Sequence, residues 1–314
     1  MEHCTAVAIE GGGAKGILCI GMIRALDEHL PIKAGVTRSE YFNNFKMFSG
    51  CSCGSIVALM LLLNTETETI QKILEPIFSS FRNMMPHPDL SMLLDHFGLD
   101  DAAAIRQIVN HTLRAAGICD DASFKDMRRL LRKDFTCVAT DLNAREPIYF
   151  SPDNTPDTKI ADAIIMSCTL PLLYAPLKYN EHLMVDGGLT HLMPRNTPID
   201  ETLFIYFGQS QADTINSLND YLYMILSMAF DRDDGGWFKT RPCIALELPP
   251  SLRYEKSIDF EINRQGVEAR IMAGYASTIA SLYPNCMSTI GAVIYMVYET
   301  ILEQYFLPEF DVES

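Results

Sequence analysis

The stretch Phe48-Ser49-Gly50-Cys51-Ser52-Cys53-Gly54-Ser55-Ile56 places one serine between two glycines. The apolar residues before it predict the end of a strand, and the apolar run from Ile56 to Leu63 predicts a buried helix after it. A Gly-x-Ser-x-Gly sequence at a strand-to-helix turn is typical of a nucleophile elbow. Gly50 and Gly54 have no Cβ, so the turn can be tight and the helix can pack closely on the strand. Ser52 is therefore a candidate nucleophile.

A second strand, glycine loop and helix occur at the start of the sequence. Thr5 to Ile9 predict a strand, and an amphipathic helical pattern through Leu30 follows the loop Gly11-Gly12-Gly13-Ala14-Lys15-Gly16. Unobstructed backbone N–H groups beside a helix N-terminus suit a developing negative charge, so this loop is a candidate oxyanion hole, with Gly12 and Gly13 the foremost donors. Two such units predict a parallel sheet covered by helices.

The glycine loop also fits other interpretations. Gly11-x-Gly13-x-x-Gly16 matches a dinucleotide-binding fingerprint, which requires an acidic residue about twenty positions later, at the end of a second strand. Asp27 and Glu28 fall inside the first helical pattern instead. Dinucleotide binding and a turn that only packs remain the alternatives for this loop.

The base that would activate Ser52 is not the one an elbow usually implies. A Ser-Asp-His order puts the histidine late in the chain, but His191 is the last histidine here. A triad through His191 stays open. Val185-Asp186-Gly187-Gly188 offers another arrangement, because it places a carboxylate at the end of an apolar run. Burial raises the pKa of a carboxyl group towards the basicity of a general base, so Asp186 is the candidate base.

Composition excludes several classes of protein. The net charge of −15 over 314 residues argues against general nucleic-acid binding and against indiscriminate adhesion to anionic membranes. The nine cysteines are odd in number and scattered, which favours reduced thiols in a cytoplasmic compartment. Cys51-x-Cys53 has the wrong spacing for a zinc site, and no metal or other cofactor is expected. The residues Met1 to Cys4 lack the features of a signal peptide.

The remaining patterns predict one domain over residues 1–314, with the motifs in about 4–197 and a mainly helical part from about 210 to 314. Pro284 interrupts the uncharged stretch from Ile271 to Tyr298, which predicts two core helices rather than a membrane span. Helical patterns also cover Glu66 to Phe81 and Asp101 to Ala116, and strand patterns cover 135–140, 147–150, 203–206 and 243–246.

Two features could contact lipid. A helical pattern with a Ser123 and Asp126 start signal carries a basic stripe, which could meet phosphate head groups or be an ordinary solvated face: Lys125, Arg128, Arg129, Arg132 and Lys133. The apolar segments 84–86 and 221–226 are candidates for a lid or an acyl channel, or for plain core packing.

Five segments in order resemble the patatin-like phospholipase family. They are the glycine loop, the elbow, Ala139-Thr140-Asp141-Leu142, the segment Ser167-Cys168-Thr169-Leu170-Pro171 ending in Ala175-Pro176, and Asp186-Gly187-Gly188. Departing from the family, Leu189 to Pro194 lacks the usual Asn-rich stretch and leaves His191 without a role, while Asp141 is expected to cap a turn.

The resemblance implies a three-layer α/β/α fold with a mainly parallel central sheet. It also implies a cofactor-independent lipid acyl hydrolase for phospholipids or lysophospholipids, with peripheral membrane contact. Ser52 would be the nucleophile, Asp186 the base, and Gly11, Gly12 and Gly13 the oxyanion hole. Support would come from Gly50, Gly54, Lys15, Gly16, Gly187 and Gly188. A catalytically silent lipid-binding protein of the same fold is the competing interpretation.

Overall fold

The computed structural model describes residues 3–78, 88–208, 236–248 and 264–284, and the isolated positions 83, 85, 86, 215, 221 and 224. Its centre is an eight-stranded sheet with the order β10-β9-β1-β2-β4-β8-β7, and β5 pairs with β4 beside this path. The parallel strands are β1 (Ala6–Ile9), β2 (Met47–Cys51), β4 (Asp134–Asp141), β9 (Thr202–Phe207) and β10 (Cys243–Leu246). The antiparallel strands are β5 (Glu146–Phe150), β7 (Leu177–Tyr179) and β8 (His182–Asp186).

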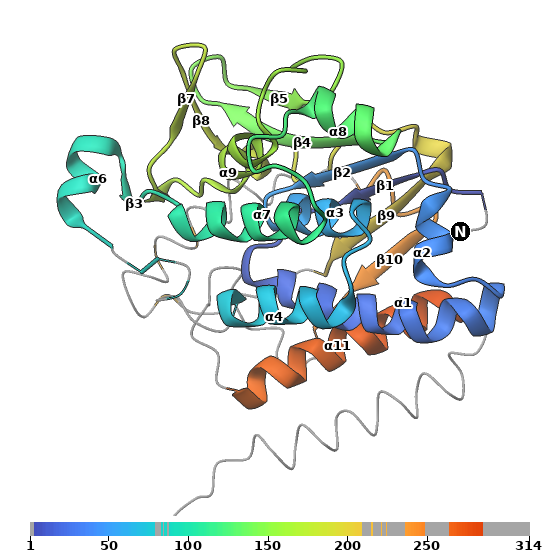
Figure 1. Ribbon diagram of the computed structural model, residues 1–314. Helices are drawn as coiled ribbons and strands as arrows, with labels where there is room; N and C mark the ends of the chain where they lie inside the picture. The colour runs from blue at the N-terminus through green and yellow to red at the C-terminus, as the bar shows by residue number, and fades with distance from the viewer. Residues whose placement is uncertain are drawn as a thin grey trace, which may run out of the picture.

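Helices cover the sheet, and four of them form its principal packing layer (Figure 1). These are α1 (Leu18–Ala34), α3 (Cys53–Leu62), α9 (Ile160–Cys168) and α11 (Arg264–Leu282). Around them lie α2 (Arg38–Asn43), α4 (Thr67–Phe78), α7 (Ala103–Ala115) and α8 (Phe124–Leu131). The predicted α/β class with a mainly parallel central sheet is confirmed, and it agrees with a three-layer α/β/α arrangement.

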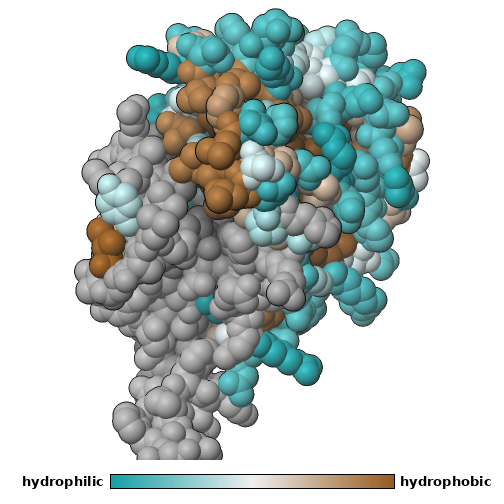
Figure 2. All heavy atoms as spheres, turned by 90° about the vertical axis from the view of Figure 1, so that its left-hand side faces the viewer, coloured by the Kyte–Doolittle hydropathy of each residue, from teal (hydrophilic) through white to brown (hydrophobic). Residues whose placement is uncertain are grey.

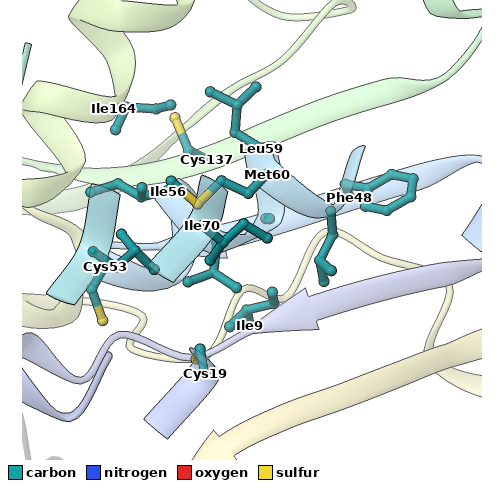
Figure 3. Close-up of a cluster of buried hydrophobic side chains, with 14 of the residues drawn as sticks. Ile9, Cys19, Phe48, Cys53, Ile56, Leu59, Met60, Ile70, Cys137 and Ile164 are labelled. Atoms are coloured by element: carbon teal, nitrogen blue, oxygen red, sulfur yellow. The ribbon is translucent and has the colours of Figure 1, made fainter. Parts of the chain in front are cut away.

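The largest core lies between the sheet and these helices. Helix α3 is part of this core on all its sides, since it is apolar all round and every one of its ten residues is buried. Figure 3 shows its side chains Ile56, Leu59 and Met60 together with Ile9 and Phe48 of the strands. Helices α1 and α11 cross so closely that a Cβ on Gly21 would lie 1.7 Å from the carbonyl oxygen of Ile271. The α1–α11 crossing is therefore built on backbone contact.

The opposite face of the sheet is covered, among the described residues, by the chain around 193–196 and by the turn at 236–240. Phe204 of β9 packs on Trp237 and Phe238. Asn196 forms hydrogen bonds with Ser49 of β2 and Thr136 of β4, at 2.9 Å each. This face therefore combines an aromatic cluster with a buried polar network.

Shorter elements complete the described part. A separate parallel pair is formed by β3 (Gly98–Asp100) and β6 (Leu172–Tyr174), and α6 (Leu90–His96) precedes β3. Three short 3-10 helices are η1 (Gly13–Ile17), η2 (Gly187–Leu189) and η3 (Ile199–Glu201).

The structure tests some of the helix expectations. Helix α11 ends at Leu282, two residues before Pro284, while the remainder of the 271–298 stretch lies outside the described residues, as does most of the candidate lid 221–226. Met85 of the other candidate lid is buried. No described helix has the length and apolar character that crossing a membrane requires.

Candidate active site

Ser52 lies on the turn between β2 and α3, at the end of the parallel strands where their carboxyl edges meet. Its backbone has φ 52° and ψ −131°, a conformation that side-chain-bearing residues rarely adopt and that costs on the order of 1–3 kcal/mol. The flanking glycines permit it. A Cβ on Gly50 would lie 2.4 Å from the carbonyl oxygen of Gly54, and one on Gly54 would lie 2.4 Å from that of Glu10. The turn thus has the geometry of a nucleophile elbow.

Sheet order brings Asp186 to this turn. Cys51 of β2 pairs with Val138 of β4, and the next residue of β4, Ala139, pairs with Asp186 at the end of antiparallel β8. The Ser52 hydroxyl donates a hydrogen bond of 2.6 Å to Asp186 Oδ2, and the Gly188 N–H donates one of 2.8 Å to Asp186 Oδ1. Serine and carboxylate are therefore in direct contact, with no histidine between them.

Burial sets the chemistry of this carboxylate. Asp186 is 1% exposed and Ser52 is 7% exposed. Burial raises the pKa of Asp186 to about 6, although the hydrogen bonds from Ser52 and Gly188 favour the charged form. A carboxylate with this pKa is ionised at neutral pH and is a much stronger base than an ordinary aspartate.

Ser167, on α9, fixes the position of the elbow. Its hydroxyl accepts a hydrogen bond of 2.9 Å from the N–H of Ser52 and donates one of 2.6 Å to the carbonyl oxygen of Val138. The side chain is completely buried. The sequence placed Ser167 in a family segment but gave it no role, because its two partners lie 115 and 29 residues away.

Replacing Ser167 with alanine is expected to lower the free energy of unfolding by about 1–3 kcal/mol, since a buried N–H of the elbow loses its acceptor. Denaturant unfolding measures the change. Ser281→Ala is the matched control, because the Ser281 hydroxyl also accepts a backbone N–H and donates to a carbonyl, but at a half-buried site. Equal losses in the two variants would contradict a special role for Ser167.

The glycine loop lies beside Ser52, and its N–H groups differ in their partners. The Gly11 N–H donates to the carbonyl oxygen of Leu192 at 3.0 Å, so the prediction of Gly11 as an oxyanion donor is wrong. Burial raises the pKa of the Cys53 thiol to about 12, and the nearby backbone N–H groups of Gly12 and Gly13 partly offset this rise. Both N–H groups therefore lie near the residue that follows Ser52 in the chain.

Lys15 and Gly16 support this loop from within η1. The Lys15 ammonium donates to the carbonyl oxygen of Gly208 at 2.8 Å, just beyond β9, and the Lys15 N–H donates to the carbonyl oxygen of Gly12 at 3.1 Å. Gly16 is buried. The next strand after this loop is β2, which ends at Cys51 and is followed by Ser52. A dinucleotide site would need an acidic residue at the end of this strand. The geometry therefore does not favour the dinucleotide interpretation.

His191 and Asp141 take structural contacts. His191 Nδ1 lies 2.7 Å from the hydroxyl of Tyr149. Asp141 accepts hydrogen bonds from the N–H groups of Asn143 and Ala144, which holds a turn as the sequence predicts, and its other oxygen lies 2.7 Å from His182 Nδ1.

An apolar pocket opens beside Ser52. Ser52, Gly13 and Cys53 line one end of it, and the rest of the lining comes mainly from aliphatic side chains: Ile56, Leu74, Ile77, Ile105, Ile108 and Leu170. These residues belong to α3, α4, α7 and the segment after α9. The space suits a hydrocarbon chain, because few polar groups in it need a partner.

The basic stripe is not the continuous helical face that the sequence predicted. Helix α8 ends at Leu131, and Arg132 adopts φ 57°, which turns the chain away from the helix. Carboxylates pair with Lys125, Arg128 and Arg129, while Lys133 donates to the carbonyl oxygen of Phe42.

The basic stripe also lies at the opposite edge of the sheet from Ser52. Asp134, which begins β4 just after α8, pairs with Met47 at the start of β2, whereas Ser52 follows the end of β2. The five residues of β2 separate these edges by roughly 15 Å. Head-group contact by these cations would not place a lipid at Ser52.

Comparison with known proteins gives consistent matches. The family model described as Patatin-like phospholipase matches residues 7–203. An uncharacterized protein R571 of Acanthamoeba polyphaga mimivirus is 26% identical over 69% of this chain and 72% of its own length. The probable lipid hydrolase 463L of Invertebrate iridescent virus 6 is 23% identical, over 63% of each chain. Among solved structures, VipD from Legionella pneumophila has a TM-score of 0.58 at 17% identity, over 90% of this chain and 67% of VipD.

Proposed function

The chain belongs to the patatin-like phospholipase family, and from this premise we propose that it is a lipid acyl hydrolase acting through Ser52 and Asp186. Its substrates would be fatty-acyl esters of phospholipids or lysophospholipids. The observation that carries the proposal is the 2.6 Å hydrogen bond from the Ser52 hydroxyl to the buried carboxylate of Asp186. The similarity to a probable lipid hydrolase of an iridescent virus supports the same class of substrate.

Each step of the proposed reaction has a group to perform it. Asp186 accepts the hydroxyl proton while Ser52 Oγ attacks the ester carbonyl carbon, which forms a tetrahedral intermediate. The N–H groups of Gly12 and Gly13, in the loop beside Ser52, stabilise its oxyanion. The intermediate collapses as Asp186 returns the proton to the leaving alcohol. Water deprotonated by Asp186 then hydrolyses the acyl-enzyme and releases the fatty acid and Ser52.

The apolar lining of the pocket favours an ester whose acid part is an acyl chain over one whose acid part carries a polar substituent. It starts at Ser52 and continues between α4 and α7 along Leu74, Ile77, Ile105 and Ile108. Each buried CH₂ of a fatty-acyl chain contributes about 0.8 kcal/mol to binding. The head group would remain on the solvent side of the nucleophile.

Incubation of the protein with phosphatidylcholine and lysophosphatidylcholine vesicles, followed by mass spectrometry of the products, tests the function directly. Free fatty acid together with the matching deacylated lipid is expected. Labelling of Ser52 by a fluorophosphonate probe reports an activated hydroxyl independently of the substrate chosen. A protein that neither releases fatty acid nor reacts with the probe would instead be a catalytically silent lipid binder.

The rate is expected to depend on the ionisation of Asp186. Its carboxylate must be charged to accept a proton, so kcat/KM should be half-maximal near pH 6, fall about tenfold per unit at lower pH, and be level above about pH 7. Hydrolysis of a neutral ester between pH 4.5 and 8.5 measures the profile. A rate that is constant from pH 5 to pH 8 would exclude Asp186 as the base.

Protonation of Asp186 should raise the free energy of unfolding over the same pH range in which it lowers kcat/KM. The pKa of Asp186 is raised in the folded protein above the ordinary 3.8, so the folded state binds this proton more tightly than the unfolded state. This group alone therefore stabilises the fold as the pH falls from 6 towards 4, by about 3 kcal/mol at most. A loss of rate in this window thus reflects protonation of Asp186 and not unfolding driven by it.

A further inference from the structure

Helix α6 presents apolar side chains to solvent. None of its residues is buried, and Leu90 and Leu94 are 68% and 77% exposed. Phe97, which ends the helix, is 59% exposed, and Leu172 of β6 is 46% exposed. Figure 1 shows α6 standing off the body of the molecule, and Figure 2 shows a broad hydrophobic area on the side of the molecule where α6 lies. We call Leu90, Leu94, Phe97 and Leu172 the α6 patch.

The backbone holds two residues of the α6 patch in unfavourable conformations. Phe97 has φ 67° and Leu172 has φ 69°, a region that bulky side chains rarely adopt. The two residues lie close together, because Gly98, which follows Phe97, pairs with Leu172 in the β3–β6 pair. Strain that persists at exposed apolar residues is not explained by core packing, and such outliers are typical of functional segments.

The α6 patch adjoins the pocket at Ser52 through the chain around β6. Leu170 and Tyr174 line that pocket, and Leu172 lies between them in the chain with its side chain on the outside. Strand β6 therefore carries both an exposed residue of the α6 patch, Leu172, and a residue of the pocket lining, Tyr174. An acyl chain that leaves a lipid layer at the α6 patch would reach the pocket within one short strand.

The charged residues near the α6 patch indicate which lipid head groups it could approach. The sequence from Asn83 to Ile105 contains no lysine or arginine, and its exposed acidic residues are Asp89, Asp95 and Asp101. The segment from Thr169 to Leu177 contains no charged residue. Anionic head groups would be repelled here, whereas zwitterionic or neutral ones would not.

We propose that the α6 patch is a lipid-docking surface that inserts into zwitterionic membranes and delivers acyl chains to the pocket at Ser52. The delivery rests on the proposed function, while the docking does not require catalysis. An exposed apolar cluster of this size marks an interaction site, and insertion of such side chains at the interface drives membrane binding.

The test measures binding of the Ser52→Ala protein to phosphatidylcholine vesicles by co-sedimentation, so that turnover cannot change the surface. Adding Leu90→Ser and Leu94→Ser is expected to lower the partition coefficient at least about tenfold, because two exposed leucines no longer enter the lipid. The matched control adds Ile32→Ser and Leu130→Ser, which are similarly exposed but lie on α1 and α8. The control should bind within about twofold of the parent, and thermal unfolding should show that both variants are folded.

Vesicles containing phosphatidylserine provide the opposing result. Binding that strengthens with anionic lipid and ignores Leu90 and Leu94 would overturn the proposal and favour the basic residues near α8. Loss of a protein dimer in the patch variant, without loss of vesicle binding, would also overturn it. If binding depends on the α6 patch but the active protein releases no fatty acid from the bound vesicles, the docking surface stands and the proposed function fails.

Discussion

Replacing Ser52 with alanine is expected to lower fatty-acid release by on the order of 10⁴-fold or more, because no other hydroxyl in the described part of the chain donates to the Asp186 carboxylate. The same variant should lose labelling by a fluorophosphonate probe. Mass spectrometry of released fatty acid and gel detection of the label measure the two effects. Ser281→Ala, far along α11, should retain both.

A correct fold must accompany the loss of activity in Ser52→Ala. Removing the hydroxyl takes away a hydrogen bond that lowers the pKa of Asp186, so this pKa should rise further in the variant. The protein should still unfold in one cooperative transition. Release of fatty acid at more than about one per cent of the parent rate would disprove the assignment of Ser52 as the nucleophile.

Replacing Asp186 with asparagine is expected to lower kcat by about 10³-fold or more, with a much smaller effect on KM, since the amide cannot accept the serine proton. Asparagine has nearly the same shape as aspartate, and its oxygen can still accept the N–H of Gly188. The amide also removes a buried charge, so the variant should unfold at the same or a higher temperature at pH 8. Steady-state kinetics and calorimetry measure the two changes.

Asp141→Asn is the matched control for Asp186→Asn. Asp141 also ends a strand and also accepts backbone N–H groups, but it does not touch Ser52. Its variant should keep the parent rate within a fewfold. Full activity in Asp186→Asn, or an equal loss in both variants, would refute the Ser52–Asp186 dyad.

The sequence was sufficient to predict the elbow because the requirement is local. Gly50 and Gly54 are needed by contacts within a few residues of Ser52 and with the neighbouring strand β1. The candidate base was also predictable, since the histidine that a triad needs is missing from the late part of the chain. The contact between the two residues depends on the strand order, which no sequence pattern specifies. Strand β8 runs antiparallel to β4, and this pairing brings the Asp186 carboxylate to 2.6 Å from the Ser52 hydroxyl oxygen.

Other features depend on contacts between distant residues and could not be predicted. The partner of the Gly11 N–H is a carbonyl oxygen 181 positions later, at Leu192, which removes this glycine from the predicted oxyanion hole. Carboxylates of separate segments, such as Asp153 and Asp157, pair with the cations of α8. The exposure of Leu90 and Leu94 was likewise not among the features that the sequence predicted.

The α1–α11 crossing has a consequence for what constitutes the working enzyme. A Cβ on Gly21 would strike the backbone of Ile271, and one on Gly274 would lie 1.9 Å from the carbonyl oxygen of Leu18. The close packing of the two helices therefore requires glycine at both positions. Helix α11 begins some sixty residues beyond the end of the family match at residue 203. Helix α1 begins directly after the glycine loop, so a chain truncated before α11 would lose the helix that packs on α1 and supports this loop. We propose that the smallest independently folding catalytic unit extends at least to Leu282.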